Sequence, residues 1–132
     1  AALEIGFKEV KPKGRWGYFH RIGSYGQLRP LPTTYFRFFL MINALFWNIR
    51  GVAKTPNLRR LKKLIRLNNV QLVAICEPKL NVENIESIRL RLSFDAVVVN
   101  LSADIWVFYN LPFICDIAGN SDQHISLILQ HP

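Results

Sequence analysis

The sequence predicts an α/β fold in which a strand–helix–strand unit opens a sheet that antiparallel hairpins then continue. Two apolar segments of strand length, 42–48 and 70–76, flank one amphipathic segment, 55–66. Shorter apolar segments separated by polar connections follow between residues 94 and 130. The length of 132 residues suits one domain or part of a larger one.

The first strand and the helix are predicted from their residue patterns. Residues 42–48 are apolar on both alternating faces, as in a strand buried between layers. Thr55 and Pro56 predict an N-cap followed by proline at the first helical position. The helix carries an apolar stripe of Leu58, Leu61, Leu64 and Ile65 and an opposite basic face of Arg59, Arg60, Lys62, Lys63 and Arg66. Asn68 and Asn69 predict its end.

The second strand covers residues 70–76 and stops at Glu77 and Pro78. Two strands joined by one short crossover helix run parallel, so residues 42–76 predict a βαβ unit. A second, short helix is predicted after Asn81, which precedes an apolar face of Val82, Ile85 and Ile88.

The remaining strands are predicted at 94–100, 104–109, 113–118 and 123–130. Their short connections indicate antiparallel hairpins. We therefore expect one mixed sheet with helices on one face, which is half of an α/β sandwich. The other apolar face of that sheet would be uncovered, which predicts self-association through it.

The first 40 residues have a different composition, with five of the seven glycines and nine aromatic residues. We find no sustained period of 2 or 3.6 in them, so we expect a poorly ordered basic extension over 1–40 and a domain over 41–132. The alternative for this extension is an arm that stacks on and neutralises a nucleic-acid strand. The only methionine, Met41, is a candidate natural start.

Positive charge is concentrated in one part of the chain. The formal net charge is +8, and residues 50–66 contribute seven cations and no anion. This distribution predicts a polyanionic partner, most commonly nucleic acid, although such a helix face is also typical of a solvated surface. Two cysteines exclude a disulfide scaffold, and the apolar run 38–47 is shorter than the ~20 residues of a membrane span. We expect a soluble intracellular protein, nuclear or cytoplasmic, with no membrane partner.

Polar side chains stand at the ends of the two parallel strands. Asn48 ends the first strand and Glu77 ends the second. Because parallel strands end at the same edge of a sheet, we expect an amide and a carboxylate side by side, where open α/β sheets place ligands. A Mg²⁺ ion takes one or two carboxylates and completes its shell with water and phosphate oxygens. This pair is therefore a candidate partial metal site.

The residues around this pair form recognisable sequence motifs. The segment Phe46-Trp47-Asn48-Ile49-Arg50-Gly51 is followed by the pattern Arg59-Arg60-x-x-x-Leu64 and then by Ile75-Cys76-Glu77-Pro78-Lys79. They resemble the start of the endonuclease/exonuclease/phosphatase family, in particular the endonuclease domains of plant non-LTR retrotransposons. The resemblance covers about residues 42–130.

The resemblance implies a Mg²⁺- or Mn²⁺-dependent phosphodiesterase with a DNase I-like α/β sandwich and no small-molecule cofactor. It implies that Glu77 is a metal ligand and that Asn48 helps to hold the metal or the phosphate, both as catalytic residues. It also implies that Arg50 and Lys79 contact phosphates of DNA, or of RNA, at the same rim. The helix cations Arg59, Arg60 and Lys63 complete the candidate nucleic-acid-binding residues.

Other parts of the family pattern have no counterpart. The family also uses a tyrosine, an Asp/Asn pair and an Asp-His pair that activates water, and neither His124 nor His131 follows an aspartate. We therefore expect the chain to be the N-terminal part of such a domain and to be inactive as a nuclease. The alternatives are a non-catalytic basic nucleic-acid-binding module and a functionless pseudogene fragment.

Overall fold

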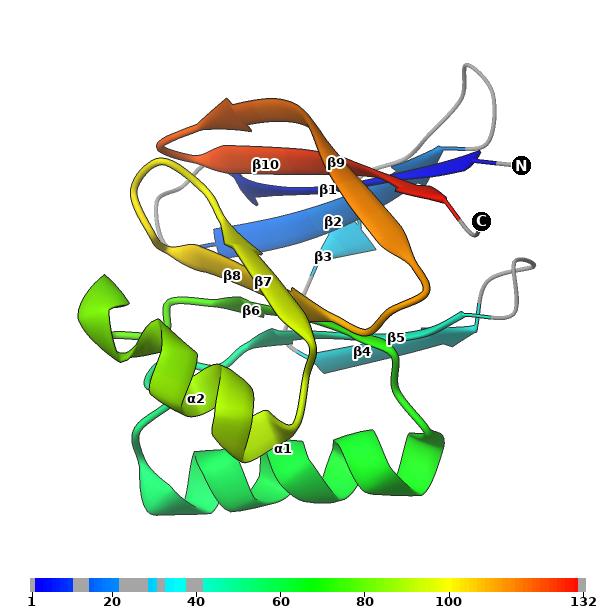
Figure 1. The fold of residues 1–132 in the computed structure, drawn as a ribbon. Helices are drawn as coiled ribbons and strands as arrows, with labels where there is room; N and C mark the ends of the chain where they lie inside the picture. The colour runs from blue at the N-terminus through cyan, green and yellow to red at the C-terminus, as the bar shows by residue number, and fades with distance from the viewer. Residues whose placement is uncertain (1, 11–14, 22–28, 31–32, 38–41, 131–132) are drawn as a thin grey trace.

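Two five-stranded sheets pack face to face, and two helices cover the outer face of one of them (Figure 1). The computed structural model describes residues 2–10, 15–21, 29–30, 33–37 and 42–130. This mixed α/β architecture confirms the predicted α/β class. No helix in the described ranges is long and apolar enough to cross a bilayer.

Sheet B contains the predicted βαβ unit. Its strands, in spatial order, are β4 (Thr33–Arg37), β5 (Asn43–Asn48), β6 (Leu72–Cys76), β8 (Ile105–Tyr109) and β7 (Ala96–Val99). Strands β5 and β6 are parallel, as predicted, and the other neighbours are antiparallel. The register places Asn48 opposite Cys76, so the two parallel strands end level with each other.

Sheet A is wholly antiparallel. Its strands, in spatial order, are β3 (Arg29–Pro30), β2 (Arg15–Arg21), β1 (Ala2–Val10), β10 (His124–Gln130) and β9 (Ile114–Ser121). The first strand of the chain therefore pairs with the last described one, in a ladder from Ala2 opposite Gln130 to Lys8 opposite His124.

Both helices pack on sheet B, on the side away from sheet A. Helix α1 (Thr55–Asn68) begins with Lys54 as its N-cap, one residue before the predicted Thr55. It ends at Asn69, whose left-handed backbone (φ 48°) closes it. A 3-10 turn, η1 (Val82–Asn84), leads into α2 (Ile85–Leu92). Their buried contacts with the sheet involve Leu58, Leu61, Ile88 and Leu92 of the helices and Val73, Ile75, Trp106 and Phe108 of the strands.

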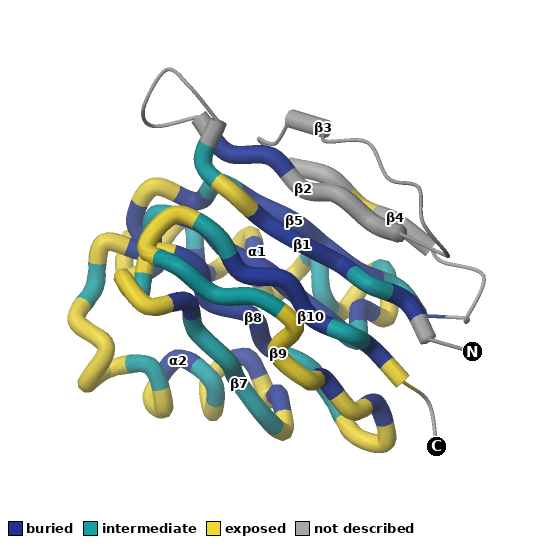
Figure 2. The backbone as a smooth tube through the Cα atoms, turned by 90° about the horizontal axis from the view of Figure 1, so that it is seen from above, coloured by how far each residue is buried: buried dark blue, intermediate teal, exposed yellow. Residues whose placement is uncertain are grey.

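A second apolar core lies between the sheets. In sheet A its side chains are Leu3, Ile5 and Phe7 of β1 and Ile125, Leu127 and Leu129 of β10, all at most 1% exposed. Phe7 meets Phe46 of sheet B edge to face, with ring centroids 5.0 Å apart. Figure 2 shows the buried part of β1 in dark blue, lying beside β10.

This core corrects the expectation for residues 1–40. Residues 2–10 and 15–21 are strands of sheet A, and β1 buries three apolar side chains. Leu3, Ile5 and Phe7 alternate with residues that point away from the core, which is the pattern of a half-buried strand. The expected domain boundary at residues 40–41, Met41 and His131 all lie outside the described residues.

The expectation of a single sheet with one uncovered face was also wrong. Strands β9 and β10 do not continue sheet B after β8; they pair with β1 in sheet A and cover the face that was expected to be exposed. These strands join sheet A because β10 pairs with β1 over seven residues. The sequence pattern did not reveal β1 as a strand. The premise for self-association through that face is therefore removed.

Candidate functional site

The carboxyl ends of β5 and β6 stay paired beyond the strands. The backbone N–H of Ile49 donates to the carbonyl of Cys76 (3.1 Å), and that of Gly51 donates to Glu77 (2.9 Å). Together with the pairing of Asn48 and Cys76, these bonds hold the backbones of Asn48 and Glu77 at one edge of sheet B. We call this edge the rim. The sequence predicted this juxtaposition correctly.

The Glu77 side chain bridges the two sheets at the rim. Its Oε1 accepts a hydrogen bond from Nε1 of Trp16 in β2 (3.3 Å), and its Oε2 lies 3.9 Å from Nε of Arg50. The Glu77 side chain is 22% exposed, and that of Arg50 is 68% exposed. Glu77 is thus fixed on one side by a buried indole and accessible on the other.

Asn48 presents an unpaired oxygen on the same side. Ala44 and Phe46 face sheet A, and Asn48, two residues further along the same strand, shares that face. Within the described part of the chain, its buried Oδ1 has no hydrogen-bond partner. An unsatisfied buried acceptor costs about 1–3 kcal/mol, so a ligand that contacts it would recover that free energy.

Backbone strain is concentrated at the rim. Six described non-glycine residues have positive φ, and two of them, Asn69 and Ser93, end the helices. The other four are Arg50, Glu77, Lys79 and Ala103. Arg50 follows β5, and Glu77 and Lys79 follow β6. Ala103 adjoins them because the next residue, Asp104, accepts a hydrogen bond at its carbonyl from the N–H of Glu77 (2.9 Å). Strained backbone of this kind clusters at ligand sites in proteins.

A polar network at the rim ties the two sheets together. Asn100, which is 2% exposed, donates through Nδ2 to the carbonyls of Ser121 and Asp122 (both 3.2 Å). Its Oδ1 accepts from the N–H of Ile105 (2.9 Å). The turn after β7 is therefore fastened to the β9–β10 turn of sheet A. Sequence reasoning missed Asn100, since nothing in the local pattern indicates its partners.

Two more residues at the rim were not singled out from the sequence. Trp16 contacts Glu77 from β2. Glu9 lies opposite Trp16 in the β1–β2 ladder and shares a face with Phe7, so it belongs to the edge of sheet A nearest Glu77. The alternation of β1 is the signal that would have placed Glu9 there.

Cys76 adjoins the site but is not a nucleophile. Its thiol is fully buried. Burial raises the pKa of Cys76 well above its usual range, and the nearby carboxylates of Glu77 and Asp104 raise it further. A neutral buried thiol neither attacks a substrate nor ligates a metal.

The other predicted nucleic-acid-binding residues fall into two groups. Arg50 and Lys79 are exposed at the rim beside Glu77. Arg59, Arg60 and Lys63 are exposed on α1, in the helix layer, where the Arg60 guanidinium lies 5.7 Å from the ring centroid of Trp47. The structure thus brings Asn48, Glu77, Arg50 and Lys79 together and places the helix cations on a separate surface that begins just after the rim.

His124 does not face this site. Core-facing residues of β10 are Ile125, Leu127 and Leu129, so His124 lies on the outer face of sheet A. Partial burial lowers the pKa of His124, and nearby Lys8 lowers it further, while Glu4 opposes the shift. Its position gives it no role in activating water beside Glu77.

The rim offers two oxygen ligands suited to a divalent cation. Mg²⁺ bound through one or two carboxylates usually keeps several waters and contacts substrate phosphates. The unpaired Oδ1 of Asn48 and the accessible side of the Glu77 carboxylate fit this coordination. No cluster of three or more His, Cys, Asp or Glu side chains occurs in the described ranges. Comparison with protein-family models, with curated proteins and with solved structures gives no match.

Proposed function

We propose that this chain is an endonuclease/exonuclease/phosphatase-like domain of retroelement type that binds a divalent cation and a nucleic-acid phosphate at the rim without cleaving the strand. The observation that carries the proposal is the buried, unpaired Oδ1 of Asn48 at the end of β5, where backbone hydrogen bonds hold that strand level with the end of β6 and with Glu77. Two sheets packed face to face support a DNase I-like sandwich as the finer fold.

Each rim residue has a defined part in this proposal. Glu77 and Asn48 hold the cation, which, when bound, neutralises charge on a phosphate oxygen. Arg50 and Lys79 attract the phosphate from the exposed side. Trp16 orients the Glu77 carboxylate by its hydrogen bond to Oε1. Binding therefore combines a metal-bridged contact with direct charge attraction.

The proposal that the strand is not cleaved rests on the sequence. Hydrolysis of a phosphodiester needs a group that deprotonates the attacking water. No histidine of the chain follows an aspartate: Phe19, Gln123 and Gln130 precede the three histidines. His124 lies on the outer face of sheet A, so among the described residues it does not supply the histidine of such a pair at the rim.

A second candidate function is a basic nucleic-acid-binding module without a metal. The exposed cations of α1 favour it, because they form a surface separate from Glu77. In this case binding depends on salt concentration and not on the rim.

Binding of a fluorescent DNA duplex at constant ionic strength separates the two. Without divalent cation, we expect Glu77→Gln to bind at least as tightly as the parent chain, because a negative charge near the phosphate is removed. With Mg²⁺ we expect the order to reverse, since only the parent chain gains the bridging ion. Glu83→Gln, an exposed acidic residue of η1, is the matched control and should follow the parent chain.

The same samples test for cleavage with a supercoiled plasmid. We expect no nicking with Mg²⁺ or Mn²⁺. Nicking that Glu77→Ala abolishes would show a working nuclease. An order of affinities that Mg²⁺ leaves unchanged would support the metal-independent module instead, and a lack of binding at low salt would support a functionless fragment.

A further inference from the structure

A small basic pocket lies between the start of α1 and the end of α2, and none of the proposed metal ligands lines it. Its volume is about 200 Å³, and its lining is Ala53, Thr55, Leu58, Arg59, Lys62 and Arg91. Every charged residue in this lining is positive. Pockets for drug-sized ligands measure about 300–1,000 Å³, so this smaller one suits a group the size of a phosphate.

The three cations converge on the pocket from two elements. Arg59 and Lys62 are three residues apart on α1 and therefore neighbours on one face of the helix. Arg91 comes from α2, a helix that is acidic in its first turn. Arg50 pairs with Glu77 and Arg89 pairs with Glu86, and within the described part of the chain none of the three cations in the pocket is seen in an ion pair with a carboxylate. Three unpaired like charges favour a bound anion.

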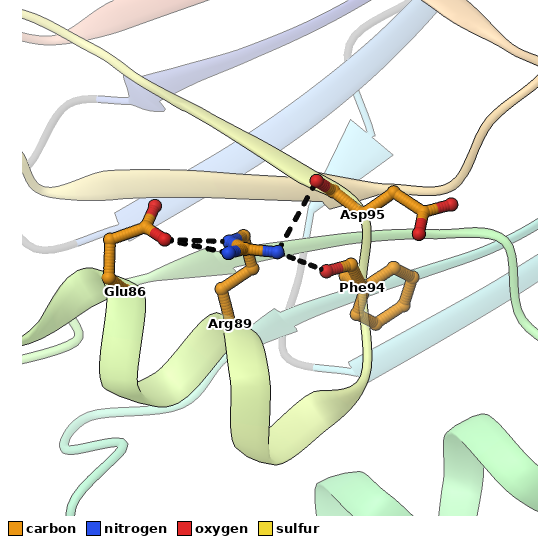
Figure 3. Close-up of polar contacts among 4 residues, drawn as sticks. All are labelled: Glu86, Arg89, Phe94 and Asp95. Atoms are coloured by element: carbon orange, nitrogen blue, oxygen red, sulfur yellow. Dashed lines mark hydrogen bonds and ion pairs between the residues drawn. The ribbon is translucent and has the colours of Figure 1, made fainter.

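The end of α2, which carries Arg91, is held firmly in place. Arg89 donates to Oε2 of Glu86 through Nε (2.9 Å) and Nη2 (2.8 Å), and to the carbonyl of Phe94 through Nη1 (2.8 Å), as Figure 3 shows. The same Nη1 reaches the carbonyl of Asp95 (3.3 Å). Arg89 thereby fixes the last turn of α2, which is the turn that carries Arg91.

We propose that this pocket is a phosphate-binding site in which Arg59 and Arg91 donate hydrogen bonds to the phosphate oxygens and Lys62 supplies a further positive charge. Arginine binds phosphate through paired N–H groups, and lysine acts as a point charge. This inference rests on the proposed function in one respect only, which is that the phosphate belongs to a nucleic-acid strand. The phosphate is either a backbone phosphodiester or a terminal monoester.

The pocket lies close to the rim along the chain. Arg50 is at the rim, and Ala53 and Thr55 already line the pocket. A strand that contacts both sites would be held at two points by different chemistry. Only the contact at the rim involves the divalent cation, so the two sites can be measured separately.

Fluorescence anisotropy with a labelled single-stranded oligothymidylate, in EDTA, tests the pocket. We expect Arg91→Gln to weaken binding by about tenfold, the loss of one charge-assisted contact. Lys62→Gln should weaken it by a smaller factor. Arg66→Gln removes the same charge from α1 outside the pocket and should weaken binding by about twofold or less, as expected for a single exposed charge. Circular dichroism and thermal unfolding verify that each variant is folded.

A second arm identifies the source of the phosphate. The oligonucleotide is compared with and without a 5′-phosphate, and with inorganic phosphate as competitor. Tighter binding of the 5′-phosphorylated strand that Arg91→Gln abolishes assigns the pocket to a terminal phosphate. Equal binding of both strands, with loss in Arg91→Gln, assigns it to the backbone.

The outcome that overturns the proposal is an equal effect of Arg91→Gln and Arg66→Gln on both strands, which shows general attraction only. Because EDTA removes the divalent cation, this result does not depend on Glu77. A failure of the pocket therefore leaves the proposed function standing, and a failure of the metal site leaves the pocket standing.

Discussion

Trp16 donates a hydrogen bond from Nε1 to Oε1 of Glu77 across 3.3 Å, and the two residues are 61 positions apart in the chain. The bond joins β2 of sheet A to the end of β6 in sheet B. The N-terminal segment is thus part of both the core and the candidate site. Glu77, which the resemblance implies is a metal ligand, is therefore oriented by Trp16, a residue that we expected to lie in a poorly ordered extension.

The Trp16–Glu77 contact predicts an energetic coupling between the two residues. In a double-mutant cycle of Trp16→Phe and Glu77→Ala, we expect a coupling free energy of about 0.5–1.5 kcal/mol, the usual worth of one hydrogen bond. Phenylalanine keeps most of the apolar contact and removes the donor. Urea unfolding of the four proteins measures the coupling. Strictly additive effects would show that the contact contributes nothing to folding.

The burial of Phe7 predicts a large loss of stability on truncation. Phe7 is 0% exposed and packs edge to face on Phe46. We expect Phe7→Ala to lower the free energy of unfolding by about 3–5 kcal/mol, because it leaves a cavity between the sheets. Lys8→Ala, at the adjacent exposed position, should change it by less than about 0.5 kcal/mol. Similar small effects for both variants would show that residues 1–10 do not contribute to the core, as expected of an extension.

Both cysteines should be unreactive in the folded protein. Burial raises the pKa of Cys115 to about 12, with a smaller effect of Asp116, and raises that of Cys76 further. The reactive species is the thiolate, so we expect neither residue to react with a thiol reagent at about pH 8 until the protein is unfolded. Rapid labelling of the native protein would show that the core between the sheets is open.

His124 predicts a pH dependence of stability. Partial burial and Lys8 lower its pKa in the folded protein below the usual value of 6.5. The unfolded chain therefore binds more protons at mildly acidic pH, and the contribution of His124 to stability is lost as pH falls from about 6.5 through the folded pKa. We expect His124→Gln to have a flatter stability profile over this range in urea unfolding. Parallel profiles for the two proteins would contradict the shift.

The βαβ unit was predictable because its signals are local. The apolar run of β5, the amphipathic pattern of α1 and the apolar run of β6 each occupy consecutive residues, and a short crossover permits only a parallel pair. The positions of Asn48 and Glu77 at one edge follow from that pair. The N-cap of this helix was predicted to within one residue, at Thr55 instead of Lys54.

The second sheet was not predictable in the same way. The alternation of Leu3, Ile5 and Phe7 is brief, and the glycine-rich, aromatic-rich residues that follow obscured it. The partner of β1 is β10, which lies more than 100 residues away in the chain. A local sequence pattern does not predict a pairing over that distance. For the same reason the sequence singled out Glu77 but not Trp16, and Arg59 but not Arg91, which lines the same pocket.

The most direct measurement of the central claim is binding of Mn²⁺ followed by the electron paramagnetic resonance signal of the free ion. We predict one site in the parent chain that Mg²⁺ displaces, and a site of the same affinity in Glu83→Gln. We predict loss of this site in Glu77→Gln, whose side chain lacks the negative charge. Equal uptake of Mn²⁺ by the parent chain and Glu77→Gln would contradict the account, because the rim would then hold no cation.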